Sequence, residues 1–268
     1  MQHLIKKGEI NLCYRKYVED GFFKKNLKLW QRLRIKKLIR FGLPSKGRLK
    51  KQVENFFSER GLELVNAGTI REYLAEFKGE KKVQIILLAA SDIPLEIKKG
   101  NLDVGITGRD LIFEKILDWR KCILELKQLD FGEADLVIGV PQFWIDVNHL
   151  DDLDEVAFFF RKKYSRCLRI ATKYQNITRE FLIDNQVTNF EIIESQGATE
   201  GAIINSIADV IVDISSTGET LKQNKLKTIE NGTLLKSVAS IFVNKRYYKK
   251  NKSDIELKKL LDQFVLGN

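Results

Sequence analysis

The fold class is decided by residues 208–221, which read Ala208-Asp209-Val210-Ile211-Val212-Asp213-Ile214-Ser215-Ser216-Thr217-Gly218-Glu219-Thr220-Leu221. The apolar run Val210–Ile214 has the length and β-branched composition of a buried strand. Small hydroxyl residues and a glycine follow it, and the next segment predicts a short helix over Leu221–Leu226. A buried strand that passes through such a turn into a helix is typical of an α/β fold.

Strands and helices alternate on both sides of this stretch. The expected strands are Leu38–Leu43, Val83–Ala89, Asp103–Ile106, Asp135–Val140, Arg169–Thr172, Phe190–Glu194, Val210–Ile214 and Ser237–Asn244. The expected helices lie between Ser45 and Gly61 and over Ile93–Lys99, Leu111–Leu117, Ile177–Asn185, Thr199–Ile207, Leu221–Leu226 and Ile255–Val265. This alternation predicts βαβ units and mainly parallel sheets.

The turn after the strand is the first candidate for chemistry. Backbone N–H groups at such a turn lack partners, and the following helix adds the positive end of its dipole. The hydroxyl groups of Ser216, Thr217 and Thr220 can add donors, and Gly218 lets the backbone approach an anion. Asp213 can accept hydrogen bonds from sugar hydroxyls. A phosphate-binding loop and an ordinary capped helix are both open at this point.

Three further positions are candidates because ligands in open α/β sheets bind beyond the carboxyl ends of strands. Lys46 and Arg48 follow the first strand and would attract a pyrophosphate or triphosphate, or they form a solvated first turn. The glycine-rich segment Asp103–Asp110 is a ligand loop or a plain tight turn. Glu200, at the start of a helix, either binds a ribose diol or Mg²⁺ or complements the helix dipole.

Composition narrows the class of protein. With 268 residues, 44% of them hydrophobic, the chain can form one large domain or two small ones. No apolar run is long enough to span a bilayer and no export signal opens the chain, so we expect a cytoplasmic protein without a membrane partner. Cys13, Cys122 and Cys167 show no C-x-x-C spacing, which disfavours a disulfide framework and a zinc site. His3 and His149 lack the partners of a catalytic triad or metal cluster, so histidine chemistry is not expected.

Residues 1–37 form a basic N-terminal extension. They hold eleven Lys and Arg against three Asp and Glu, which is +8 of the chain's net charge of +10. Most of the positive charge therefore lies in this extension and little of it in the rest of the chain, so we expect no nucleic-acid partner for the main fold. The plainest interpretation is a poorly ordered segment. The alternatives are a basic amphipathic helix over Phe22–Leu38 that docks on a membrane surface, a nucleic acid or a partner, an organellar presequence, and a wrongly chosen start codon.

The combination of these segments resembles the ATP phosphoribosyltransferase family, which opens histidine biosynthesis. The central part is Glu200 followed by Ala208-Asp209-x-Ile211-x-Asp213-x-x-x-Thr217-Gly218-x-Thr220-Leu221-x-x-Asn224-x-Leu226. The resemblance continues, in family order, in Leu43–Leu49, Asp92–Pro94, Asp103–Gly108, Leu129–Gly132, Val140–Pro141 and Ile170–Tyr174. It covers about residues 38–244, most of the chain.

The resemblance implies two α/β domains of the type-II periplasmic-binding-protein kind with the active site in the interdomain cleft. Residues 38–132 and 222–268 would form domain I and residues 133–221 domain II, with the outgoing crossover near Phe131–Glu133. Asp213 and Glu200 would face the ribose of phosphoribosyl pyrophosphate. Its 5-phosphate would lie in the loop Ser216–Thr220, whose residues are Ser216, Thr217, Gly218, Glu219 and Thr220. Lys46 and Arg48 would lie near the pyrophosphate or triphosphate.

The implied reaction joins ATP and phosphoribosyl pyrophosphate to give phosphoribosyl-ATP and pyrophosphate. Mg²⁺ is expected as the cofactor, bound mainly through substrate phosphates, with no metal cage made by the protein. About twenty residues follow Asn244, so the chain resembles the family's short form, which works in a hetero-oligomer with a regulatory subunit similar to histidyl-tRNA synthetase. One departure is Glu133-Ala134-Asp135, where the family usually has a small residue, Cys and a cation.

Three other functions remain open from the sequence. A solute-binding protein of the same shape would need an export signal. A regulatory or nucleic-acid-binding protein would act through residues 1–37. Another phosphoribosyltransferase would use quinolinate, orotate or a purine base, and substrate competition separates it from the first choice.

Overall fold

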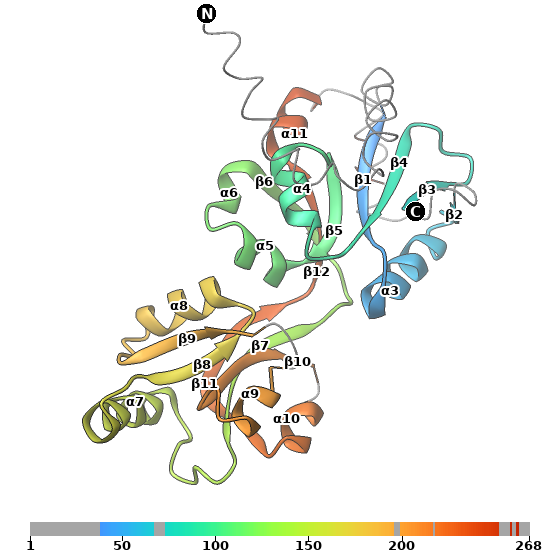
Figure 1. Ribbon diagram of the computed structural model, residues 1–268. Coiled ribbons are helices and arrows are strands. Elements are labelled where there is room, and N and C mark those ends of the chain that lie inside the picture. Colours follow the sequence, from blue (N-terminus) through green and yellow to red (C-terminus); the bar gives the residue numbers. More distant parts are fainter. Residues whose placement is uncertain are drawn as a thin grey trace, which may run out of the picture.

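The computed structural model describes residues 38–66, 73–195, 199–216, 218–251, 258, 261 and 262. Figure 1 shows them in two units, each built on its own sheet, and the predicted architecture of two α/β units is confirmed. Within the described ranges, no helix is both long and apolar enough to cross a bilayer. The basic extension and all but three residues of the expected helix Ile255–Val265 lie outside the described residues.

The larger sheet has seven strands in the order β2-β3-β4-β1-β5-β12-β6. Its unit consists of β1 (Ile39–Pro44), α3 (Gly47–Ser58), β2 (Leu64–Asn66), β3 (Leu74–Phe77), β4 (Val83–Leu88), α4 (Ile93–Lys99), β5 (Val104–Gly108), α5 (Arg109–Lys115), α6 (Trp119–Cys122), β6 (Ile123–Gln128), β12 (Ala239–Asn244) and α11 (Lys245–Asn251). β1 runs parallel to both β4 and β5, whereas β12 is antiparallel to β5 and β6. The carboxyl ends of β1, β4 and β5 therefore lie at one edge of the sheet.

The helix α3 packs on the larger sheet through one apolar face. Val53, Phe56 and Phe57 recur at helical spacing and are buried against the sheet. The ring of Phe57 lies edge-on to that of Phe41 on β1, with centroids 5.8 Å apart, and 4.8 Å from that of Phe77 on β3. Burial of these rings fixes where the start of α3 stands at the end of β1.

The smaller sheet has five strands in the order β11-β7-β10-β8-β9. Its unit consists of β7 (Ala134–Pro141), α7 (Leu150–Tyr164), β8 (Leu168–Thr172), α8 (Gln175–Asp184), β9 (Phe190–Glu194), α9 (Gly201–Ile204), β10 (Val210–Ser215), α10 (Glu219–Gln223) and β11 (Leu226–Ser237). β8, β9 and β10 are parallel to one another, and β7 is antiparallel to β10 and β11. Alternate β7 residues Leu136, Ile138 and Val140 pack in one core with Leu153 and Ala157 of α7.

The chain passes between the units twice. The outgoing crossover lies between β6 and β7, as predicted near Phe131–Glu133. The return was expected after residue 221, which would place residues 222–237 in the first unit. β11 instead pairs with β7 over most of its length, so the chain returns at Val238, between β11 and β12. The expectation failed because β11 has one strand neighbour and carries polar residues and a bulge, which hide a strand pattern in the sequence.

Candidate active site

The carboxyl ends of parallel strands from both sheets lie beside the two crossovers. In the larger sheet, Arg109 directly after β5 donates its backbone N–H to the carbonyl of Val238 at 3.1 Å. In the smaller sheet, Ser215 at the end of β10 is in register with Asp135 at the start of β7. The loops that follow β1, β5, β8 and β10 therefore start from the two sheet edges that meet at the crossovers, the position where open α/β sheets bind ligands.

The loop after β10 is built around Gly218. Its φ of 74° lies in the left-handed region, which glycine adopts without the strain that a Cβ would cause. Its N–H donates to Oγ of Ser215 at 3.0 Å, which closes a tight turn before α10. Among the described residues, and apart from the parts of the chain directly next to Gly218, no atom lies within 4 Å of the place that a Cβ of Gly218 would occupy, so one side of the loop is open. An anion can therefore approach this backbone directly.

The other residues of the loop present polar groups to solvent. Ser216, Glu219 and Thr220 are exposed. Glu219 accepts a long 3.5 Å hydrogen bond from Nε2 of Gln223 in the next turn of α10. Thr217, the remaining residue singled out from the sequence, lies outside the described residues. The hydroxyl groups of Ser216 and Thr220 are therefore accessible to a ligand at the loop where the sequence predicts phosphate binding.

Asp213, a residue of β10 itself, and Glu200, in the connection between β9 and β10, lie toward the same sheet edge. Asp213 is half-buried near the end of β10, and its carboxylate accepts the N–H of Ile214 at 2.8 Å. Glu200 is half-buried directly before α9. The segment that leads to Glu200 is tied to β8, because the N–H of Ser195 donates to the carbonyl of Thr172 at 3.0 Å. Since β8 and β10 are adjacent, both carboxylates lie at the crossover edge of the smaller sheet, which we call its rim.

Lys46 and Arg48 come from the opposite unit, at the start of α3. Both are exposed, and α3 begins without a side-chain cap. Nη2 of Arg48 donates to the carbonyl oxygen of Glu133 in the outgoing crossover at 3.0 Å. Because that bond uses the main chain, it does not depend on the acidic side chain that distinguishes Glu133 from the family pattern. The cations therefore stand beside the crossover that also borders the loop after β10.

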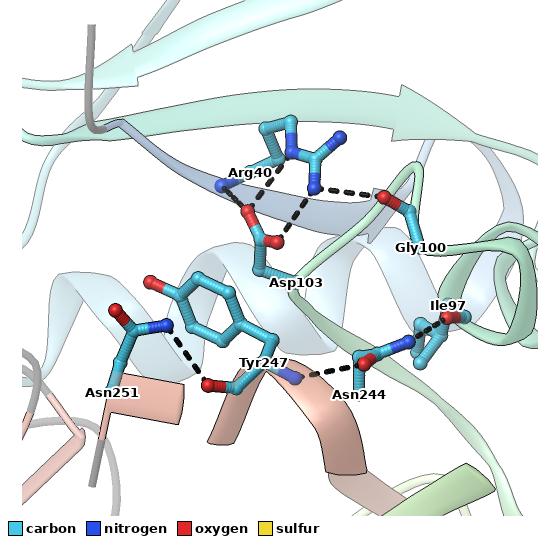
Figure 2. A network of polar contacts seen from close by, with 7 residues as sticks. All are labelled: Arg40, Ile97, Gly100, Asp103, Asn244, Tyr247 and Asn251. Carbon is cyan, nitrogen blue, oxygen red and sulfur yellow. Dashed lines mark hydrogen bonds and ion pairs between the residues drawn. The ribbon is translucent and has the colours of Figure 1, made fainter. Parts of the chain in front are cut away.

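The third candidate loop, Asp103–Asp110, begins with a structural ion pair. Figure 2 shows Asp103 accepting three hydrogen bonds from Arg40, one from its backbone N–H and two from its guanidinium, at 2.6 to 2.9 Å. These residues stand at the amino ends of β5 and β1, at the edge opposite the crossovers. A Cβ at Gly105 would come within 2.7 Å of Cγ2 of Ile93, so this glycine serves packing. The first half of the segment, with Asp103 and Gly105, therefore has a structural role and does not form a ligand loop.

Half-buried Tyr174 and the buried acids Asp110 and Glu114 lie at the crossover edge, and of these only Asp110 belonged to a segment singled out from the sequence. Oη of Tyr174 donates to Oδ2 of Asp110 at 3.2 Å. Burial raises the pKa of Tyr174 well above its ordinary value of 10.0, and the charges of Asp110, Asp213 and Glu114 add to the rise. The phenol therefore stays neutral and keeps its proton as a donor. The sequence signal for these acids was their spacing of four residues, which places Asp110 and Glu114 on one face of a helix. The structure shows that both are buried.

Two further questions are whether the described side chains form a metal site and where His149 lies. Within the described ranges, no cluster of three or more His, Cys, Asp or Glu side chains could hold a metal ion. His149 lies at the start of α7, where its N–H donates to Asp152. β7 runs from the crossover toward that end, so His149 lies at the edge away from the candidate site.

Comparisons with known proteins show which sequences and which solved fold the chain resembles. A family model described as ATP phosphoribosyltransferase (HisG) matches residues 89–265. The chain is 44% identical over 208 residues to an ATP phosphoribosyltransferase of Cereibacter sphaeroides, covering 78% of this chain and 88% of the relative. It is also 44% identical over 203 residues to an ATP phosphoribosyltransferase of Bradyrhizobium sp., covering 76% of this chain and 62% of that relative.

A solved structure shares the fold. It is the ATP phosphoribosyl transferase (HisG:HisZ) complex from Thermotoga maritima, with a TM-score of 0.65, 22% sequence identity, and coverage of 85% of this chain and 96% of that chain. At this identity the likeness concerns the fold alone.

Proposed function

The chain belongs to the ATP phosphoribosyltransferase family, and on that premise we propose that it condenses ATP with phosphoribosyl pyrophosphate to give phosphoribosyl-ATP and pyrophosphate. The chain is accordingly a pentosyltransferase acting at the first step of histidine biosynthesis. The observation that carries the proposal is the family match over residues 89–265, which includes the loops after β5, β8 and β10.

The proposed sugar-phosphate half of the site is the rim of the smaller sheet. The loop Ser216–Thr220 holds the 5-phosphate through its main-chain N–H groups and hydroxyls. Asp213 and Glu200 accept hydrogen bonds from the ribose hydroxyls. Support comes from the open side of Gly218 and from the two carboxylates toward the same sheet edge.

The proposed polyphosphate half is the start of α3. Lys46 and Arg48 offer exposed positive charge at the crossover edge, where they can neutralise the triphosphate of ATP or the leaving pyrophosphate. The two halves come from different units, so the substrates meet only if the units hold a defined mutual orientation.

The chemistry is a displacement at C1 of the ribose. N1 of the adenine ring forms a bond to C1 while the bond between C1 and the pyrophosphate oxygen breaks, and pyrophosphate leaves with that electron pair. Positive charge develops on the sugar and negative charge on the leaving group. The site therefore needs anion donors and positioning more than a strong base, which suits a rim where none of the described residues is a histidine.

Mg²⁺ is proposed as the metal, bound mainly through the oxygen atoms of the substrate phosphates. It would neutralise charge on the pyrophosphate as that group leaves. Mg²⁺ prefers oxygen ligands and keeps several of its waters, so the substrate phosphates can supply most of its ligands, and Glu200 is the side chain that could add one.

A regulatory subunit resembling histidyl-tRNA synthetase is proposed as the partner. The support is indirect: the similar Thermotoga maritima structure is named as a complex of HisG with HisZ. We place the reaction in the cytoplasm, where ATP and the sugar pyrophosphate are made.

The test is an absorbance assay for phosphoribosyl-ATP with purified full-length chain, run with and without the candidate regulatory subunit. Product formed from ATP, and not when orotate, quinolinate or a purine base replaces it, supports the proposal. No product under either condition, from a folded chain that binds phosphoribosyl pyrophosphate, contradicts it.

A further inference from the structure

Glu114 of α5 caps a helix of the other unit. Its two carboxylate oxygens accept the N–H of Asn176 at 3.2 and 3.1 Å, and one of them also accepts the N–H of Ile177 at 3.1 Å. Nδ2 of Asn176 donates to the carbonyl of Glu114 at 2.9 Å. α8 has no capping side chain of its own at Tyr174. The first turn of α8 thus takes its cap from a residue that precedes it by more than sixty positions.

Asp110, one turn earlier on α5, makes a second connection. Its Oδ2 accepts the hydroxyl proton of Tyr174 at 3.2 Å, and its Oδ1 accepts that of Ser237 at 2.7 Å. Oγ of Ser237 in turn accepts the N–H of Asp110 at 3.1 Å. Ser237 is the last residue of β11, next to the return crossover at Val238. One carboxylate therefore joins both units and the segment that connects them.

These bonds are shielded from water. Asp110 is 5% exposed, Glu114 7% and Ser237 1%. Burial raises the pKa of Glu114, and the N–H groups of Ile177 and Asn176 oppose that rise. Hydrogen bonds in such a low-dielectric place are electrostatically stronger than those exposed to water. A contact of this strength holds a geometry that exposed ion pairs would not.

Both helices start at the proposed substrate rims. α5 follows β5 and α8 follows β8 at the crossover edges of their sheets, and Figure 1 shows the two helices facing each other between the units. We infer that Asp110 and Glu114 form an interunit clasp on α8 and Tyr174 that sets how the polyphosphate half and the sugar-phosphate half of the site face each other. The two acids are positioning residues, and this inference rests on the proposed function.

The clasp predicts a specific kinetic effect. The sugar-phosphate loop lies wholly within the smaller unit, so loss of the clasp leaves that loop intact. Reaction of the two substrates depends on alignment of both units, and a misplacement of about 1 Å costs on the order of a hundredfold in rate. A broken clasp should therefore lower kcat while the affinity for phosphoribosyl pyrophosphate is kept.

The experiment compares Glu114→Ala, Glu114→Gln and Asp154→Asn with the wild type, each as the full chain in its active assembly. Asp154 is a matched control because its carboxylate accepts the N–H of Thr188 at 2.7 Å, a bond of the same kind inside one unit. We expect Glu114→Ala to lower kcat by roughly tenfold to a hundredfold. Glu114→Gln, which keeps one acceptor oxygen, should lose less. The dissociation constant of phosphoribosyl pyrophosphate, measured by calorimetry, should stay within about twofold in all three variants.

Small-angle X-ray scattering supplies a readout that does not need activity. The Glu114→Ala curve should depart from the wild-type curve and the Asp154→Asn curve should not. If Glu114→Ala does not fold, Tyr174→Phe removes one hydroxyl from the clasp and takes its place in both measurements. Unchanged kcat and scattering in a folded clasp variant overturn the inference, as does an equal loss of kcat in Asp154→Asn. A wild type that makes no phosphoribosyl-ATP refutes the proposed function, and the scattering comparison then decides the clasp by itself.

Discussion

Carboxylates that look alike along the chain have different surroundings in the fold. Asp209 accepts two hydrogen bonds from Arg166, at 2.6 and 2.9 Å, and more from Arg169. Asp213, one strand-length further on, has the N–H of Ile214 as its hydrogen bond and stands at the rim. Both acids belong to the segment that resembles the family. Asp209 therefore connects β8 with the start of β10, whereas Asp213 is positioned to bind a ligand.

Substitutions in the loop after β10 test the sugar-phosphate half. We expect Thr220→Ala and Gly218→Val each to raise the KM for phosphoribosyl pyrophosphate, by roughly tenfold, since each removes or misplaces donors to the phosphate. Steady-state kinetics measure the effect. Thr228→Ala, an exposed threonine on β11 in the same unit, is the control. Unchanged kinetics in both loop variants would exclude this loop from the site.

Asp209 gives a pH-dependent contribution to stability. Burial alone would raise the pKa of Asp209, but hydrogen bonds from Arg166 and Arg169 outweigh it and hold the pKa below the ordinary value of 3.8. The stabilisation is therefore present above pH 3.8 and is lost as the pH falls through the folded-state value. We expect Asp209→Asn to be less stable than the wild type at pH 7, with a difference that shrinks on acidification. Urea unfolding at several pH values measures it, and a difference independent of pH would contradict the assignment.

Elements with a strong apolar period formed where the sequence placed them. α4 over Ile93–Lys99 and β9 over Phe190–Glu194 have the predicted bounds, and β10 differs by one residue at its end. Amphipathic and irregular elements were missed. α7, the fifteen-residue helix Leu150–Tyr164, was not predicted, because its start is acidic and its Phe158–Phe160 run hides the helical period. The helix expected over Thr199–Ile207 is shortened to Gly201–Ile204.

The network in Figure 2 joins elements at the edge opposite the rim. Nδ2 of Asn244 at the end of β12 donates to the carbonyl of Ile97 in α4 at 2.7 Å, and Oδ1 of Asn244 accepts the N–H of Tyr247 at 3.0 Å. Together with the pair of Arg40 and Asp103, these bonds connect β12, α4 and α11 with the amino ends of β1 and β5 in the larger unit. The network holds the strands whose other ends carry the candidate loops.

Removal of Asp103 should therefore affect stability and not ligand binding. We expect Asp103→Ala to lower the free energy of unfolding by about 3 kcal/mol, because it leaves the guanidinium of Arg40 unpaired in a mostly buried place. Glu63→Ala, which breaks an exposed ion pair with Lys78, should leave the free energy of unfolding nearly unchanged. Urea unfolding and calorimetry with phosphoribosyl pyrophosphate measure the two properties. If a folded Asp103→Ala variant binds phosphoribosyl pyrophosphate more weakly than the wild type, the segment Asp103–Asp110 is part of the site after all.

At the scale of the molecule, the site depends on two units that each contribute one half. Both crossovers are short, and each is bonded to its neighbours: the N–H of Ala239 donates to the carbonyl of Phe131 at 3.0 Å. The clasp between α5 and α8 adds a third connection beside them. A change in the orientation of the units therefore has to break or bend these contacts.

Deletion of residues 1–37 tests whether the two units suffice. The described strands and all candidate loops lie from residue 38 onward, so we expect the shortened chain to keep kcat/KM within about threefold of the full chain. The phosphoribosyl-ATP assay measures this, with circular dichroism to show that the fold is kept. A folded deletion variant without transferase activity would assign the extension an essential role.

The sequence by itself determined the α/β class, the family, the outgoing crossover and the loop around Gly218. These depend on neighbouring residues: apolar periods, turn residues and ordered motifs are all written locally. Only the tertiary structure decided that β11 joins the smaller sheet, that Asp103 and Asp209 are held by arginines, and that α5 clasps α8. Those outcomes depend on contacts between residues forty or more positions apart, and pairing at that distance leaves no local pattern from which it can be predicted.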